Sequence, residues 1–226
     1  MIIEVLYPNL CNLFGDRGNV VYLKKCLAKA KFIETSIDDE PYFVRHKVDL
    51  IYMGPASERS QEIIISKLLP YKNKLNKLID NNTAFLLTGN AMEIFGKQII
   101  DKDGTIINGL DLIDLVAHRD MFGRISSIFL GKYEDLDFVG FQSQFTLIET
   151  NENKIIDKKY GIGLNNDNYG AIIKNSLIAT PLLGPILVMN PLFTKHVLKL
   201  EKLPYEEDLM KAYEIRLSEF INIANR

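Results

Sequence analysis

The chain has 226 residues and a formal net charge of -2, so it offers no broad basic field for a phosphate backbone, and nucleic acid is excluded as an expected partner. Apolar residues make up 47% of the chain and charged residues 25%, which is ordinary for a soluble protein, and no apolar run approaches the length of a membrane span. We expect a single α/β domain over residues 1–226. The N-terminus lacks a secretory signal pattern, which predicts a cytoplasmic protein.

The first half of the chain alternates strand-like and helix-like segments. In chain order the pattern predicts a strand over Ile2–Tyr7, a helix over Gly18–Lys31, a strand over Val48–Met53, a long helix over Glu62–Asp80, and a strand, turn and helix over 84–97. This alternation predicts a mostly parallel sheet with flanking helices. In such folds functional groups lie at the carboxyl ends of the strands.

Beyond residue 97 the segments become shorter and turn signals more frequent, which predicts an antiparallel extension in the C-terminal half. The expected elements are a turn at 101–105, strands at Ile125–Leu130, Phe138–Phe141, Leu147–Glu149 and Ala171–Ala179, a surface loop at 161–170, and helices at Pro191–Lys199 and Tyr205–Ala224.

Only two cysteines occur, Cys11 and Cys26, and each has apolar neighbours. The chain has no CxxC motif and no Cys/His cluster of the kind that binds zinc or carries redox chemistry. We therefore expect two reduced, buried thiols, no metal and no cofactor.

Residues 85–97 read FLLTGNAMEIFGK, an apolar strand followed by a tight turn and the start of a helix. A turn of this form presents a Ser or Cys nucleophile at its apex in many enzymes. The apex here is Gly89, between Thr88 and Asn90, and glycine carries no side chain. The segment is therefore interpreted as an active site that has lost its nucleophile.

Several segments, in the right order, resemble one enzyme family. They are LYPNLCNLFGDRGNVVYLKK at 6–25, the turn after Met53, IFGK at 94–97, DGTIINGLDLID at 103–114, the Gly-Phe pair at 140–141 and LLGPILVMNP at 182–191. Together they resemble class I glutamine amidotransferases of the cobyric acid synthase (CobB/CobQ-like) type, most closely the glutaminase subunit of lipid II isoglutaminyl synthase. The resemblance covers nearly the whole chain and implies a flavodoxin-like α/β fold.

Enzymes of this family hydrolyse glutamine with a cysteine nucleophile, a histidine base and backbone N–H groups that hold an oxyanion, and they pass ammonia to a synthetase. The resemblance places the nucleophile position, the first residue of a Cys-Gly-Gly-Tyr-Gln run, at Gly89. It places the base at Leu183 and one oxyanion donor at Pro55, which has no N–H. The family's Gly-Phe-Glu-Asn-His-Gly-Gly run has become GFQSQFT at 140–146. The resemblance thus implies a catalytically degenerate glutaminase, whereas each position taken alone is an ordinary core or turn residue.

Thr88 is a weaker candidate nucleophile, because a shift of one residue would bring its hydroxyl to the apex. It would still need a base, and the three histidines lie in other segments, at His46, His118 and His196. Arg119 is a candidate for the arginine that grips the substrate carboxylate in this family, although the register from Gly123 favours Asp120. The segment around His118 is more simply interpreted as a solvated charged turn.

The GDRGN loop supplies another polar pair, Asp16 and Arg17. Asp16 is predicted to cap the following helix through its side chain. Arg17, together with Arg59 in the turn after the second strand, is predicted to contact a partner at the rim of the cleft.

The leading functional prediction is a non-catalytic, glutaminase-like subunit that supports or regulates a Mur-ligase-like partner in amidation of a peptidoglycan precursor. Two alternatives stay open: an active amidotransferase subunit that uses Thr88, and a stand-alone small-molecule sensor. The partner interface is expected at the cleft mouth, where the elbow, the 54–61 turn and the 161–170 loop are predicted to converge.

Overall fold

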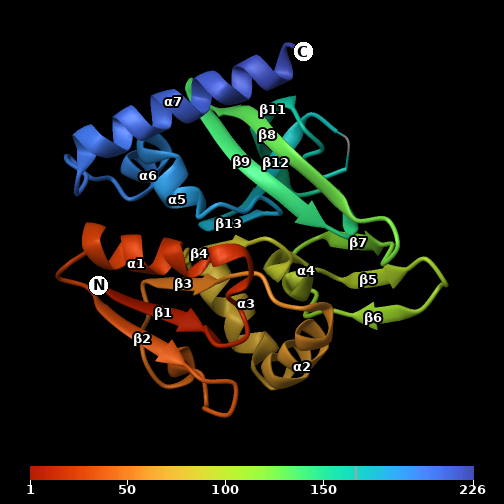
Figure 1. The fold of residues 1–226 in the computed structure, drawn as a ribbon. Coiled ribbons are helices and arrows are strands. Elements are labelled where there is room, and N and C mark those ends of the chain that lie inside the picture. The colour runs from red at the N-terminus through yellow and green to blue at the C-terminus, as the bar shows by residue number, and fades with distance from the viewer. Residues whose placement is uncertain (166) are drawn as a thin grey trace.

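The computed structural model describes residues 1–165 and 167–226, and within them the strands form a larger and a smaller sheet (Figure 1). The larger sheet has the order β2-β1-β3-β4-β13-β12-β11-β8-β9, and the smaller has the order β10-β7-β5-β6. The strands are β1 (Ile2–Leu6), β2 (Lys31–Thr35), β3 (Leu50–Met53), β4 (Ala84–Thr88), β5 (Gln98–Asp101), β6 (Ile106–Asn108), β7 (Leu115–Arg119), β8 (Ile125–Tyr133), β9 (Leu136–Gln144), β10 (Thr146–Thr150), β11 (Asn153–Tyr160), β12 (Tyr169–Lys174) and β13 (Leu177–Thr180).

Helices flank these sheets on several sides. They are α1 (Arg17–Cys26), α2 (Glu58–Leu68), α3 (Lys72–Asp80), α4 (Ala91–Phe95), α5 (Ile186–Met189), α6 (Pro191–Val197) and α7 (Glu206–Ala224), with short 3-10 helices η1 (Leu13–Gly15), η2 (Tyr42–Val44) and η3 (Leu69–Tyr71). Within the described ranges, no helix combines the length and apolar character that crossing a membrane requires.

The larger sheet changes character along its width, as the sequence predicted. The pairs β2–β1, β1–β3, β3–β4 and β4–β13 are all parallel. The pairs β13–β12, β12–β11, β11–β8 and β8–β9 are all antiparallel. The predicted α/β class, with a mostly parallel N-terminal half and an antiparallel extension, is therefore confirmed.

Three boundary predictions were wrong. The helix expected over Gly18–Lys31 ends at Cys26, and Lys31 begins β2, which pairs with β1. The long helix expected over Glu62–Asp80 is divided, because Pro70 lies in η3 between α2 and α3 and cannot donate a helical N–H bond. The strand expected over Ala171–Ala179 is a hairpin that turns at Asn175, whose φ is +53°.

The segment around His118 was also predicted wrongly as a solvated turn. His118 and Arg119 lie in β7, and only Asp120 begins the turn. The 161–170 loop is less exposed than its asparagine content suggested: Leu164 is fully buried, and its carbonyl accepts the N–H of Ile148 at 2.8 Å. Residue 166 of that loop lies outside the described residues. Both cysteines are free thiols; Cys11 is buried as expected, whereas Cys26 is only partly buried.

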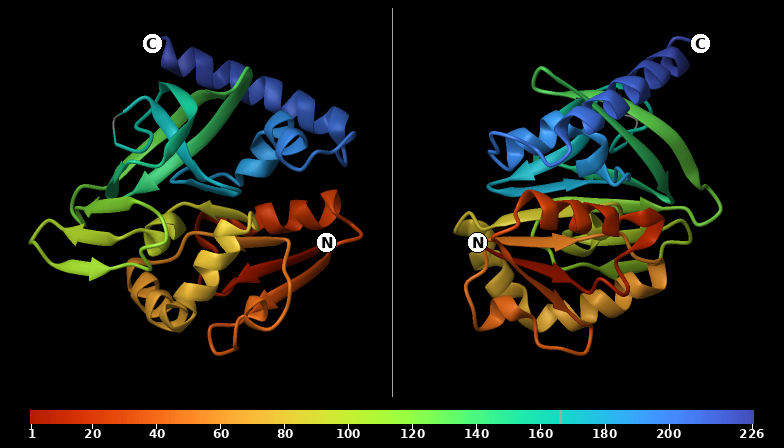
Figure 2. Two further views of the ribbon diagram at one scale, coloured as in Figure 1. Left: turned by 180° about the vertical axis from the view of Figure 1, so that it is seen from behind. Right: turned by 60° about the vertical axis from the view of Figure 1, so that its left-hand side comes forward.

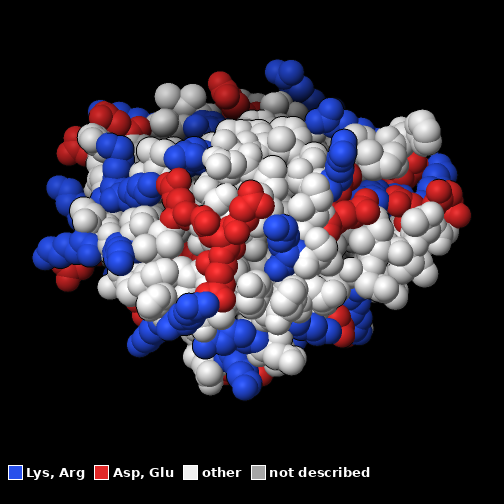
Figure 3. Space-filling model, turned by 90° about the horizontal axis from the view of Figure 1, so that it is seen from below, with Lys and Arg blue, Asp and Glu red and all other residues white. Residues whose placement is uncertain are grey.

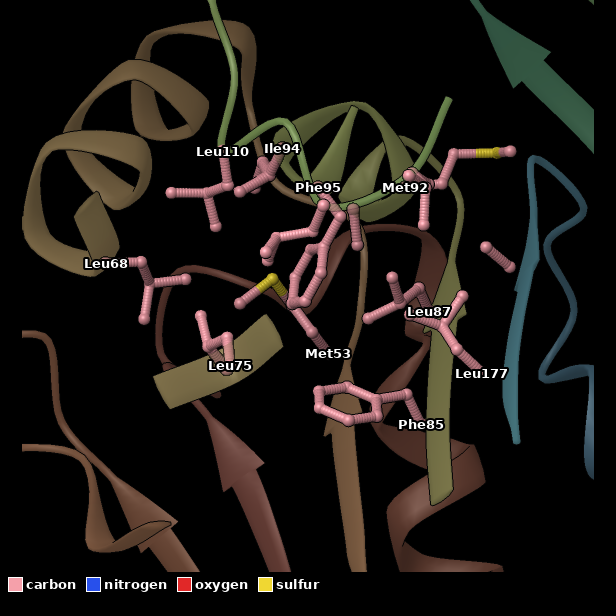
Figure 4. Close-up of a cluster of buried hydrophobic side chains, with 14 of the residues drawn as sticks. Met53, Leu68, Leu75, Phe85, Leu87, Met92, Ile94, Phe95, Leu110 and Leu177 are labelled. Carbon is pink, nitrogen blue, oxygen red and sulfur yellow. The ribbon is translucent and has the colours of Figure 1, made fainter. Parts of the chain in front are cut away.

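Two apolar cores support the larger sheet from opposite faces. One core joins β3, β4 and α4 to α2 and α3, and Figure 4 shows its side chains packed beneath α4. The other core joins the sheet to α1, α5 and α6. A third, smaller cluster seats α7 across β8 and β9, at the end of the molecule far from β2 (Figure 2). The turn between β4 and α4 is therefore supported by a buried apolar core.

Surface charge is mixed. On the face seen in Figure 3, basic and acidic side chains are interspersed and neither sign covers the face.

Candidate functional site

The turn between β4 and α4 has the backbone of a nucleophile elbow. Strand β4 ends at Thr88, Gly89 has a φ of +57°, and α4 begins at Ala91. A left-handed residue at this point favours glycine because a Cβ would be strained there. Asn90 fixes the elbow to the neighbouring loop, because its side chain accepts the N–H of Ala56 at 2.9 Å and donates to the carbonyl of Ala56 at 2.7 Å.

The structure brings together the three positions that the sequence assigned to nucleophile, base and oxyanion donor. A Cβ placed on Gly89 would lie 2.7 Å from Cβ of Pro55 and 3.0 Å from Cδ2 of Leu183. Leu183 is held there by an antiparallel bridge to Phe141, with N–H to carbonyl distances of 2.8 and 3.1 Å. The apex of the elbow is thus covered by a prolyl ring and an isobutyl group, neither of which moves a proton or donates a hydrogen bond. We call these three residues the apolar plug.

A pocket of about 150 Å³ opens in front of the apolar plug. Its apolar walls come from the plug, the η1 segment and Phe145, and its remaining walls are polar. The polar lining residues are Ser57, Glu58, Asn90, Glu93, Arg119, Arg124, Ser143, Gln144 and Thr146. The 161–170 loop, expected at this mouth, is not among the lining residues of the described chain.

That loop lies behind the pocket wall instead. The Gln142 side chain accepts the N–H groups of Ile162 and Gly163 at 3.1 and 2.9 Å and donates to the carbonyl of Gly163 at 2.8 Å. Of the three segments predicted to converge, the structure therefore brings together the elbow and the 54–61 turn.

Glu93 forms the polar floor of the pocket. It is 2% exposed, and its carboxyl accepts a bond from Gln61 at 2.9 Å and another from the Thr146 hydroxyl at 2.5 Å. Burial raises the pKa of Glu93 to about 7, although both hydrogen bonds favour the ionised form. Sequence reasoning missed this residue. The available signal was its position four residues after Gly89, where the family run has a neutral glutamine.

Arg119 lines the same pocket and is 6% exposed. Its Nε and Nη2 donate to the two carboxylate oxygens of Asp101 at 2.6 and 2.8 Å, a bidentate pair that fixes the plane of the guanidinium. Its Nη1 is buried and has no hydrogen-bond partner among the described residues. Asp120, the alternative from the register, instead holds a turn and pairs with Lys102.

Thr88 lies outside the lining of this pocket and is completely buried. Its hydroxyl donates to Asp16 at 2.8 Å and lies 3.3 Å from the hydroxyl of Tyr52. Asn19 completes the network by donating to Asp16 and to Tyr52, each at 3.0 Å. Burial raises the pKa of Asp16 to about 6 despite these bonds.

The predicted capping role of Asp16 was wrong. Asp16 occupies the N-cap position of α1, but its side chain makes no capping hydrogen bond. The carboxylate instead accepts hydrogen bonds from Tyr52 and Thr88 inside the protein. The cap comes from Asn12, whose side-chain oxygen accepts the N–H of Arg17 at 3.0 Å.

The remaining predicted residues are separated. The Arg17 guanidinium pairs with Glu34 of β2 at 3.3 Å, whereas Arg59 is exposed on α2, next to the pocket residue Glu58. His46 stacks on Tyr42, and His118 lies 3.2 Å from Glu149 on the exposed face of β7. His196 lies on α6 and contacts Tyr133. No histidine lines the described pocket.

Comparison with known proteins finds solved structures of similar fold and relatives of similar sequence. No protein-family model matches the chain. Among solved structures, a glutamine amidotransferase superposes with a TM-score of 0.56 at 13% identity, covering 87% of this chain and 97% of the other. Another, from Thermotoga maritima, superposes with a TM-score of 0.54 at 8% identity, covering 100% and 94%. The fold is therefore that of the class I glutamine amidotransferases.

Sequence comparison narrows the relationship further. The chain is 26% identical over 227 residues to lipid II isoglutaminyl synthase (glutamine-hydrolyzing) subunit GatD of Streptococcus pneumoniae, covering 96% of this chain and 86% of the relative. It is 25% identical over 192 residues to the subunit of the same name from Staphylococcus aureus, covering 83% and 79%. The chain is thus a homologue of these GatD subunits, as the sequence motifs indicated.

Proposed function

We propose that this chain is a non-catalytic, glutaminase-like subunit that supports or regulates a Mur-ligase-like synthetase in amidation of a cell-wall precursor. The homologous GatD subunits carry the name of a glutamine-hydrolysing synthase of lipid II, which supports the pathway and the synthetase partner. We further propose a CobB/CobQ-like, cytoplasmic protein that forms one domain over residues 1–226.

The apolar plug is the observation that carries this proposal. Glutamine hydrolysis by the family route needs a nucleophile that attacks the amide carbon, a base that accepts its proton and N–H groups that hold the oxyanion. The residues in these places are Gly89, Leu183 and Pro55, and a Cβ added to Gly89 would lie within 3.0 Å of side-chain atoms of the other two. Loss of one oxyanion donor alone costs about 3–4 kcal/mol in an active enzyme.

The position of Thr88 gives no support to its role as an alternative nucleophile. The Thr88 hydroxyl donates to Asp16 inside the protein, on a side of the elbow that the described pocket does not reach. Asp16 is an acceptor for this proton, but a substrate carbonyl has no path to the hydroxyl oxygen. An active amidotransferase built on Thr88 would require the β4 strand to rearrange.

A small-molecule sensor remains a second candidate because of one specific observation. Arg119 has a buried guanidinium nitrogen without a described partner, and it lines a pocket that is also lined by Glu93. Buried polar groups usually have hydrogen-bond partners, so a ligand with an acceptor group would satisfy this nitrogen. A sensor function would use the pocket in front of the apolar plug and is compatible with loss of glutaminase activity.

Two measurements on the purified protein test the proposal. Ammonia release from glutamine should equal the buffer blank, with and without the Mur-ligase-like synthetase of the same organism. Size-exclusion chromatography of the two proteins together should give one complex. Ammonia release that disappears in Thr88→Ala would favour the active enzyme, and two separate peaks would leave the sensor as the better account.

A further inference from the structure

The turn that joins β7 to β8 presents an aromatic ring to solvent. Phe122 is 99% exposed, and its neighbour Met121 is 45% exposed. The turn is well held: the Asp120 side chain accepts the N–H of Phe122 at 3.0 Å, its carbonyl accepts the N–H of Gly123 at 3.0 Å, and its carboxylate pairs with Lys102 at 2.7 Å. The held backbone thus places a phenyl group in solvent, where it gains nothing from the hydrophobic effect.

Arg124, two residues further on, lies between two other aromatic rings. Its guanidinium carbon is 5.9 Å from the ring centre of Phe14 and 5.8 Å from that of Phe145. Its Nε and Nη2 both donate to the Ser143 hydroxyl, at 3.1 and 2.7 Å. In the described part of the chain no carboxylate lies within 4.0 Å of this guanidinium. Arg124 is therefore an oriented cation without an acidic partner.

These groups form one surface at the pocket mouth. Phe14, Phe145 and Arg124 line the pocket in front of the plug, and Met121 and Phe122 line a depression beside it. Arg119 lines both, so the two hollows adjoin. We call Phe14, Met121, Phe122, Phe145 and Arg124 the aromatic rim. Phe14 is 48% exposed, so two apolar side chains of the rim are nearly half exposed and a third, Phe122, is almost fully exposed.

We infer that the aromatic rim is the surface on which the synthetase docks, and that it takes a segment presenting an apolar side chain beside a carboxylate. Aromatic residues and arginine are the side chains that most often dominate binding energy at protein interfaces. The unpaired Arg124 supplies the charge complementarity, because a guanidinium with a free edge binds a carboxylate through paired hydrogen bonds. This inference rests on the proposed function and specifies its partner site.

The rim is also pre-organised for such a contact. The Asp120 turn fixes the backbone at Phe122, and the two rings and Ser143 hold the Arg124 side chain, so little backbone freedom and little freedom of the Arg124 side chain is lost when a partner binds. A partner segment seated there would cover the mouth of the pocket. The subunit would then be closed at the point where a glutaminase would release its product.

The test measures binding of the purified Mur-ligase-like synthetase of the same organism to the full chain and its variants by isothermal titration calorimetry. Phe122→Ala and Arg124→Gln should each weaken binding at least about tenfold, the effect of a hot-spot residue. Ile215→Ala is the matched control, because this α7 side chain is 63% exposed and lies away from the rim. It should leave the Kd within about twofold. Thermal denaturation should be unchanged in Phe122→Ala, since the ring is 99% exposed.

Three other outcomes overturn the inference, and they are distinguishable. If the wild-type chain binds the synthetase and both rim variants bind it equally well, the docking surface lies elsewhere and the proposed function stands. If the wild-type chain does not bind, the proposed function fails together with the docking site. If Phe122→Ala abolishes self-association seen by analytical ultracentrifugation and leaves synthetase binding intact, the occupant of the rim is a second copy of this chain.

Discussion

Restoring the cysteine alone, in Gly89→Cys, should not restore glutaminase activity and should destabilise the protein. The packing around the elbow gives the size of the destabilisation. In Gly89→Cys the new residue keeps a φ of +57°, which costs about 1–2 kcal/mol for a residue with a Cβ. That Cβ would lie 2.7 Å from Pro55 and 3.0 Å from Leu183, so the plug must shift, and overpacking of this kind costs about 1–3 kcal/mol. We expect a loss of roughly 2–5 kcal/mol in the free energy of unfolding.

Gly104→Cys separates the two contributions. Gly104 also has a positive φ, +88°, but a Cβ there meets no atom within 4 Å. This variant should lose only the backbone contribution, about 1–2 kcal/mol. Urea denaturation of both variants gives the packing contribution as their difference. Adding Pro55→Gly to Gly89→Cys should recover stability beyond the effect of Pro55→Gly alone, a positive coupling in a double-mutant cycle.

Reactivity provides the second part of this test. The introduced thiol would face the prolyl ring and an isobutyl group, which disfavours the thiolate, and no base lies near it. Gly89→Cys should not form an adduct with a glutamine-analogue electrophile at neutral pH, as followed by intact-protein mass spectrometry. A variant as stable as Gly104→Cys that is labelled rapidly would refute the description of the plug.

The other predictions concern the buried polar groups. Burial raises the pKa of Glu93 from 4.5 to about 7, so the folded state binds the proton more tightly, and stability is lost as the pH rises from about 4.5 through about 7, by on the order of 3 kcal/mol. In Glu93→Gln the free energy of unfolding, measured by denaturation, should depend less on pH over this range. An unchanged pH dependence would show that the pKa of Glu93 is not raised in the folded protein. Thr88→Ala removes a buried donor to Asp16 and should cost about 1–3 kcal/mol, whereas Thr88→Ser, which keeps the hydroxyl, should cost less. Equal effects of the two would argue against the network. Arg119→Lys breaks a buried bidentate pair and should destabilise by about 1–3 kcal/mol, while Arg45→Lys, whose pair with a glutamate is exposed, should change stability by less than about 0.5 kcal/mol.

Much of the fold was predictable from the sequence because its periodicity is strong where strands are buried. The apolar runs at Ile2–Leu6, Leu50–Met53 and Ala84–Thr88 are the parallel strands of the larger sheet. Strand β2 escaped prediction because it is an edge strand whose first four residues are exposed or only partly buried, so it has no apolar run. The break between α2 and α3 had a signal in Pro70, which the long amphipathic pattern around it concealed.

Sequence motifs assign site positions one by one, but they do not show how these residues lie relative to one another. Matching motifs assigned Pro55, Gly89 and Leu183 separately, but only the folded chain shows that Pro55 and Leu183 occupy the space that a Cβ on residue 89 would need. Glu93 was missed and Asp16 was interpreted as a helix cap, because sequence alone does not show whether a single charged residue is buried. Their roles depend on neighbours more than 30 positions away, such as Thr146 and Thr88. Contacts of that separation are set by the sheet order, which local patterns do not contain.

The central claim is that this subunit supports a synthetase without releasing ammonia from glutamine. It is tested most directly by reconstituting the subunit with the Mur-ligase-like synthetase and lipid II, and by supplying either amide-¹⁵N glutamine or ¹⁵N ammonium. Mass spectrometry of the product then gives the source of the amide nitrogen. The account predicts label from ammonium and none from glutamine. Label from glutamine that depends on the presence of this subunit would contradict it.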